Sequence, residues 1–74
     1  RRLVFIVRMR TSSMGIAELK HYIDLAEAGE QSVPERLDIM LEHRDTLHRQ
    51  IQQLQLALAA TEYKIATYTE GPTP

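Results

Sequence analysis

The feature that most constrains this chain is a seven-residue repeat in its second half. Ten positions recur at alternating spacings of three and four residues, and eight of them are apolar or aromatic: Leu37, Met40, Arg44, Leu47, Ile51, Leu54, Leu58, Thr61, Ile65 and Tyr68. A strict repeat of this kind is typical of left-handed coiled coils, in which the supercoil keeps the apolar stripe against a partner helix. We call these ten positions the seam, and we expect them to mediate dimerisation with a second copy of the chain.

Size and composition also favour association. A chain of 74 residues forms one small domain at most, and such domains commonly gain stability from disulfides, metal ions or oligomerisation. The sequence contains no cysteine, which excludes disulfides and thiolate metal sites and fits a cytoplasmic protein. No apolar run approaches the roughly 20 residues of a membrane span. The chain begins without methionine, so we expect a processed or truncated piece.

Charge is distributed unevenly along the chain. The first ten residues carry no acidic residue and four basic ones, Arg1, Arg2, Arg8 and Arg10, whereas the other 64 residues carry five basic and ten acidic residues. A basic end is suited to a polyanion, and it is equally typical of a solvated end of a short helix. The four arginines are therefore candidates for a contact with a polyanion.

Two short helices are predicted in the first part of the chain. Residues 2–10 include a β-branched run, but no second strand-like run exists to pair with it, which favours a helix. Residues 16–28 carry one apolar stripe and read as an amphipathic helix. Gly15 stands at the expected N-cap of this helix, and Gly29 stands where it should end.

A long helix is predicted to follow. Ser32 and Glu35 have the spacing of a capping box, and Pro34 falls in the first turn, where its missing N–H costs little. No glycine or further proline occurs up to Tyr68, so the helix is roughly 54 Å long. The two short helices cannot cover that length, which is a second argument for a partner.

The expected fold is therefore all-α. We assign residues 1–31 to two linker helices, residues 32–70 to the long dimerisation helix and residues 71–74 to a disordered tail. In a homodimer the long helices would form a two-stranded coiled coil. The alternative, in which the seam packs within one monomer, is disfavoured by the helix length.

The polar seam residues favour an antiparallel pair. A parallel, in-register pair would place Arg44 against Arg44, and like charges in a seam are costly. An antiparallel pair centred between Gln52 and Gln53 instead gives layers of apolar residues and joins the two polar positions. Its five layers are Leu37 with Tyr68, Met40 with Ile65, Arg44 with Thr61, Leu47 with Leu58, and Ile51 with Leu54.

Residues that could support catalysis or bind a metal ion form no convincing cluster. His43 and His48 lie about 140° apart around a helix, and His21 is distant in sequence, so we expect histidines that are solvated or lie at the rim of the helix packing. No glycine-rich phosphate loop, nucleophile elbow or serine–histidine arrangement occurs. We therefore predict no catalytic, cofactor-binding or metal-binding residue and no enzyme. Tyr22 and Tyr63 are candidates for an effector pocket, although helix packing is the favoured interpretation of both.

Several segments, taken together in their order and spacing, indicate a family. They include Phe5-Ile-Val-Arg-Met-Arg10, the segment from Met14 to Leu25, Ala28-Gly29-Glu30, Val33-Pro-Glu-Arg-Leu37, Glu42-His-Arg44 and the segment from Tyr63 to Tyr68. With these segments the chain resembles the C-terminal half of a MerR-family transcriptional regulator. The resemblance implies a preceding winged helix-turn-helix that binds promoter DNA as a homodimer. It also makes Arg1, Arg2, Arg8 and Arg10 the candidate DNA-proximal residues. It also implies that a signal changes the dimer geometry and reshapes the promoter, so that RNA polymerase is affected indirectly.

Departures from the family narrow the expected function. The helix-turn-helix and wing are missing, so we expect no reading of DNA sequence by this segment. The cysteines of the metal-sensing branches are absent, and Arg8 stands where an electrophile-sensing branch carries a cysteine. We therefore expect the dimerisation and signal-coupling region of a MerR-like regulator. The alternative is a stand-alone coiled-coil module that self-associates or forms heterodimers with a longer homologue.

Overall fold

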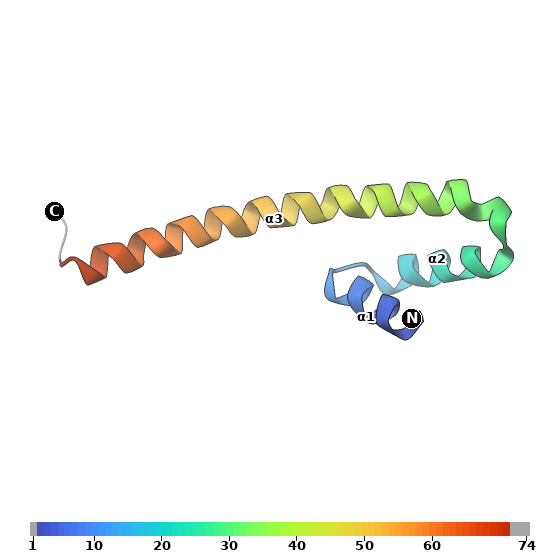
Figure 1. The fold of residues 1–74 in the computed structure, drawn as a ribbon, viewed down its shortest axis with the longest axis horizontal. Coiled ribbons are helices and arrows are strands. Elements are labelled where there is room, and N and C mark those ends of the chain that lie inside the picture. Colours follow the sequence, from blue (N-terminus) through green and yellow to red (C-terminus); the bar gives the residue numbers. More distant parts are fainter. Residues whose placement is uncertain (1, 72–74) are drawn as a thin grey trace.

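Three α-helices and one short 3₁₀ turn make up the part of the chain that the computed structural model describes, residues 2–71 (Figure 1). The elements are α1 (Arg2–Thr11), α2 (Ile16–Ala28), η1 (Glu30–Ser32) and α3 (Val33–Thr69). No strand occurs between residues 2 and 71, so the prediction of an all-α fold is confirmed. The positions of all three predicted helices are confirmed to within a residue. Arg1 and residues 72–74 of the predicted tail lie outside the described residues.

The long helix sets the shape of the molecule, whose principal dimensions are 62 × 21 × 18 Å. α2 runs antiparallel beside the first half of α3, and α1 packs against α2 (Figure 1). We call α1, α2, η1 and residues 33–50 of α3 the head. Every residue from 51 to 66 is exposed, so the second half of α3 projects from the head as a bare rod.

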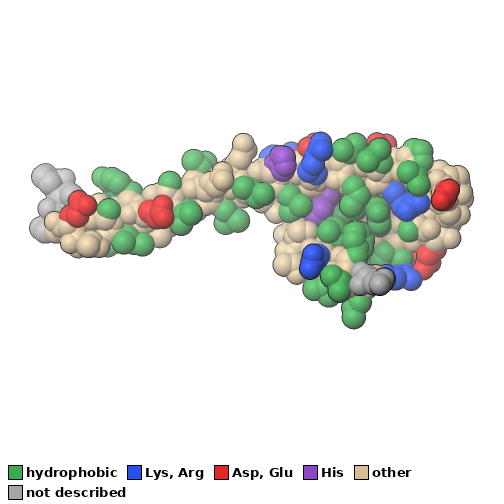
Figure 2. Space-filling model, viewed as in Figure 1, with side chains coloured by type: hydrophobic (Ala, Val, Ile, Leu, Met, Phe, Trp, Pro, Cys, Tyr) green, Lys and Arg blue, Asp and Glu red, His purple; other side chains and the backbone are tan. Residues whose placement is uncertain are grey.

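The core of the head is small. Among the described apolar side chains, Met14 and Leu19 are the buried ones, at 1% and 5% exposure. They come from the turn after α1 and from α2. Figure 2 shows hydrophobic side chains gathered across the head and further ones along the projecting rod. None of the helices described between residues 2 and 71 has the length and apolar character needed to cross a membrane.

Two glycines define the ends of α2 as the sequence predicts. Gly15 is its N-cap, with extended backbone angles and no side-chain hydrogen bond. Gly29 ends the helix at a φ of 117°, and its N–H donates to the carbonyl of Ala26 at 3.3 Å. An added Cβ on Gly29 would lie 2.8 Å from Gln31 Oε1, so both the backbone angle and the space require glycine.

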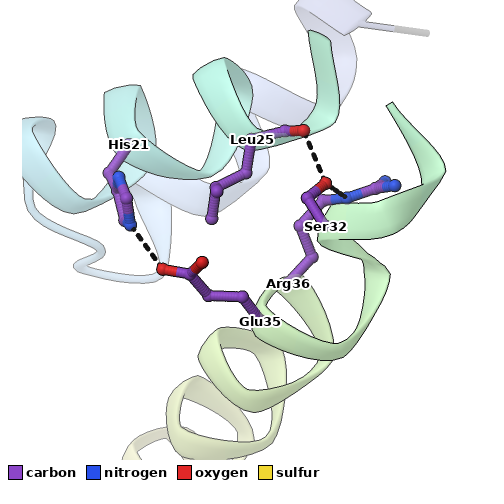
Figure 3. Close-up of polar contacts among 5 residues, drawn as sticks. All are labelled: His21, Leu25, Ser32, Glu35 and Arg36. Carbon is purple, nitrogen blue, oxygen red and sulfur yellow. Dashed lines mark hydrogen bonds and ion pairs between the residues drawn. The ribbon is translucent and has the colours of Figure 1, made fainter. Parts of the chain in front are cut away.

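The predicted capping box at the start of α3 is wrong. η1 leads directly into α3, so Ser32 already has helical backbone angles and makes no side-chain cap. Its hydroxyl instead points to the carbonyl oxygen of Leu25 at 2.5 Å and accepts from Arg36 Nε at 3.0 Å (Figure 3). The same hydroxyl lies 2.7 Å from the carbonyl oxygen of Gly29. Ser32 is buried and therefore ties the end of α2 to the first turn of α3.

Candidate functional site

α1 carries the arginines Arg2, Arg8 and Arg10. Arg2 Nη2 lies 2.9 Å from Glu27 Oε2, and Arg10 Nη1 donates to the carbonyl of Met14 at 2.7 Å. No hydrogen bond or ion pair engages the exposed Arg8 within the described chain. α1 carries no acidic residue, so Arg8 is the α1 cation best placed to meet an external anion.

The three histidines occupy three different settings. His43 is only 7% exposed, and its Nε2 lies 2.9 Å from Ser12 Oγ in the turn between α1 and α2. His21 Nε2 donates to Glu35 Oε2 at 3.0 Å, which joins α2 to α3 at an exposed position (Figure 3). His48 is exposed. The expectation of a solvated or rim histidine is therefore wrong for His43, which is buried against the turn that carries Ser12.

No metal centre emerges from these groups. Between residues 2 and 71, no three or more histidine, aspartate or glutamate side chains converge in a way that could hold a metal ion. The ring of His21 and the carboxylate of Glu35 join α2 to α3, and His43 bonds to a hydroxyl. Each of these side chains links two parts of the head.

The seam lies on α3, and its residues differ in how far they are buried. Met40 and Leu47 are half-buried, and the other eight seam residues are exposed. The exposed fractions of the apolar and aromatic ones run from 51% for Ile51 to 76% for Tyr68. Arg44 Nε lies 3.9 Å from the neighbouring Asp45 Oδ1, both at the surface. The seam thus presents an uncovered apolar stripe, and its antiparallel pairing stays a prediction.

Two shallow hollows flank Tyr22, whose ring lies 5.4 Å from that of Phe5 with a tilt of 31°. The first, of ≈ 220 Å³, lies between α1 and α2 and is lined by Arg2, Phe5, Tyr22, Ile23, Ala26 and Glu27. The second, of ≈ 240 Å³, lies where α2 meets α3 and is lined by Tyr22, Val33, Arg36, Leu37 and Met40. Tyr63 is 67% exposed on the projecting rod. Within one chain, the two candidate effector-pocket tyrosines are therefore not brought together.

Sequence reasoning overlooked the residues that organise these sites. Ser12 and His43 are 31 positions apart, and Ser32 reaches back to the end of α2. The first pair has no helical spacing, and the second joins residues of two different elements, α2 and η1. The only signal for His43 was its position beside the apolar stripe of α3, which is compatible with burial.

One comparison with known proteins gives a match. The family model described as MerR, DNA binding, matches residues 1–60, which is most of the chain. No curated protein and no solved structure matches the chain significantly. The matched residues comprise α1, α2, η1 and the first three-quarters of α3.

The match corrects the expected function. We expected a dimerisation and signal-coupling region from which the DNA-binding part is missing, or a stand-alone interaction module. The match contradicts both, because the DNA-binding family model covers residues 1–60 themselves. The expectation of a transcriptional regulator agrees with the family. The chain belongs to the MerR family of DNA-binding transcription regulators.

Proposed function

We propose that this chain is a DNA-binding segment of a transcriptional regulator and acts on promoter DNA as an antiparallel homodimer. The family match over residues 1–60 is the observation that carries the DNA-binding part of the proposal. The uncovered seam supports the homodimer. The resemblance to MerR regulators supports a promoter as the bound DNA and RNA polymerase as an indirect partner.

The contact with DNA is assigned to α1. The helix has basic residues in its last turn and no acidic residue. A guanidinium on such a helix can neutralise a phosphate and release its condensed counterions, which favours binding at low salt. Arg8 is exposed and Arg10 is held by the turn, so we assign the phosphate contact first to Arg8. Arg1 precedes them in sequence and adds to the same basic end.

A titration of labelled duplex DNA tests this assignment. Duplexes enriched from a random pool by the protein are followed by fluorescence anisotropy across a range of salt concentrations. Arg8→Ala should weaken binding to every duplex and lower the salt slope by about 1, as expected for one lost phosphate contact. Lys64→Ala removes the same charge from the projecting rod and serves as the control. Absence of duplex binding at low salt would refute the proposed function, and equal effects of the two variants would refute the assignment to Arg8.

The homodimer is assigned to the seam. Eight exposed seam residues follow one face of the 37-residue helix α3, and every residue from 51 to 66 is exposed. Burial of a Leu or Ile side chain contributes about 1.5–3 kcal/mol, and each layer of a symmetric pair occurs twice. The antiparallel register places Ile51 and Leu54 at its centre.

Disulfide trapping tests this register, since the chain has no cysteine of its own. Leu47→Cys combined with Leu58→Cys should cross-link two chains, because these positions are opposite each other in the proposed pair. Within one helix they are roughly 16 Å apart, too far for a disulfide. Leu54→Cys alone should trap poorly. Efficient trapping of Leu54→Cys and none of the double variant would refute the register. Sedimentation should show that Ile51→Ala with Leu54→Ala gives monomers.

A further inference from the structure

The hollow where α2 meets α3 is continuous with the seam. Two of its five lining residues, Leu37 and Met40, are seam positions, and Val33 and Leu37 are 47% and 54% exposed. Its floor therefore offers apolar surface to any helix that lies along the seam. With a volume of ≈ 240 Å³ it has room for one aromatic side chain.

Tyr68 lies at the opposite end of the same stripe. At 76% exposure it is the most exposed of the large hydrophobic side chains in the described chain. It follows Leu37 by 31 positions on one straight helix, which is roughly 46 Å. Tyr68 therefore cannot reach the hollow of its own chain, although it can reach that of a second copy running in the opposite direction.

The antiparallel register brings these two features together. It pairs Leu37 with Tyr68 of the second copy and Met40 with Ile65 of the second copy. We propose that the hollow lined by Tyr22, Val33, Arg36, Leu37 and Met40 is a socket for Tyr68 of a second copy. The inference rests on the homodimer of the proposed function and adds a site that is incomplete without the partner. Two-fold symmetry gives two such sockets in each dimer.

The chemistry of the socket suits a tyrosine ring. Arg36 Nε donates to Ser32 Oγ at 3.0 Å, and its Nη2 donates to the carbonyl of Gly29 at 3.4 Å. These bonds hold the planar guanidinium in place, and a held guanidinium is well suited to stacking on an aromatic face. Tyr22 supplies a second ring that already packs on Phe5. Tyr68 would therefore extend a row of aromatic rings that ends on α1.

Sedimentation equilibrium of three variants tests the socket. Tyr68→Ala empties both sockets. If each empty socket weakens the dimer by about tenfold, the dimer Kd rises by about 100-fold. Tyr63→Ala is the matched control, because Tyr63 is 67% exposed on the same rod and lies away from the seam. Its Kd should stay within about threefold of the parent, since surface substitutions have small effects. Tyr68→Phe keeps the ring and should dimerise nearly as well as the parent.

A cysteine pair gives a second measurement that does not depend on the alanine variants. Leu37→Cys combined with Tyr68→Cys should form disulfides between chains, and neither single variant should. A parent chain that sediments as a monomer at all concentrations would refute the homodimer and the socket together. A dimeric parent whose Tyr68→Ala and Tyr63→Ala variants behave alike would refute the socket and leave the homodimer standing. Failure of the cysteine pair to cross-link a dimeric protein would also refute the socket.

Discussion

The contact between Ser12 and His43 offers a quantitative test of how the turn after α1 is held on α3. Ser12 Oγ donates its proton to the carbonyl of Met9 at 3.0 Å, so it accepts from His43 Nε2 at 2.9 Å. His43 is only 7% exposed. Ser12→Ala therefore leaves a buried N–H donor without its partner, which costs about 1–3 kcal/mol of the free energy of unfolding.

A double-mutant cycle isolates that cost from the lost bond to Met9. His43→Leu removes the donor, so Ser12→Ala in that background loses only the bond to Met9, worth about 0.5–1.5 kcal/mol. The difference between the two backgrounds is expected to be about 1 kcal/mol. Urea unfolding followed by far-UV circular dichroism gives each value, at one fixed protein concentration because association shifts apparent stability. A coupling energy below about 0.3 kcal/mol would show that Ser12 and His43 contribute to stability independently, and it would refute the proposed cost of the unpaired His43 donor.

Three further predictions concern the helix packing and the turns, and the same urea unfolding measures all of them. Leu19→Ala should lower the free energy of unfolding by about 2–5 kcal/mol, whereas Ile16→Ala, at a 68% exposed position of the same helix, should change it by less than about 0.5 kcal/mol. Gly29→Ala should cost about 1–3 kcal/mol because of its φ of 117°, and Gly15→Ala, with open space around it, should cost less than about 1 kcal/mol. Ser32→Ala should cost about 1–3 kcal/mol, since it removes a hydroxyl that bonds to Leu25, Gly29 and Arg36; an unchanged stability would contradict that role.

The parts of the fold that the sequence predicts are those with local causes. Gly15 and Gly29 delimit α2 because a chain needs an N-cap and a positive φ at those two points. The length of α3 follows from the absence of helix-breaking residues between Pro34 and Gly71. The seam could be assigned for the same reason, since its period is a property of one continuous helix.

The parts that the sequence does not predict depend on contacts between distant segments. A serine before Pro-Glu fits a capping box, but η1 continues into α3 and turns the Ser32 hydroxyl toward α2. His43 resembles a surface histidine until the turn at Ser12 covers it. In both cases tertiary packing decides the hydrogen-bond partner of the side chain, and helical spacing carries no information about which segment folds back.

The half-buried seam residues connect the fold of the head to association. Met40 and Leu47 belong to the seam and are half-buried, and Met40 lines a hollow together with Tyr22 of α2, so α2 and a partner helix would pack on adjacent faces of α3. The core of the head is limited to Met14 and Leu19, which is little apolar burial for a domain of this size. A partner helix on the seam would cover Leu37 and Met40 and complete the burial of the residues on which α2 rests. The midpoint of urea unfolding should therefore rise with protein concentration, and a midpoint that is constant over a hundredfold dilution, from about 100 μM to about 1 μM, would show that the head is stable without a partner.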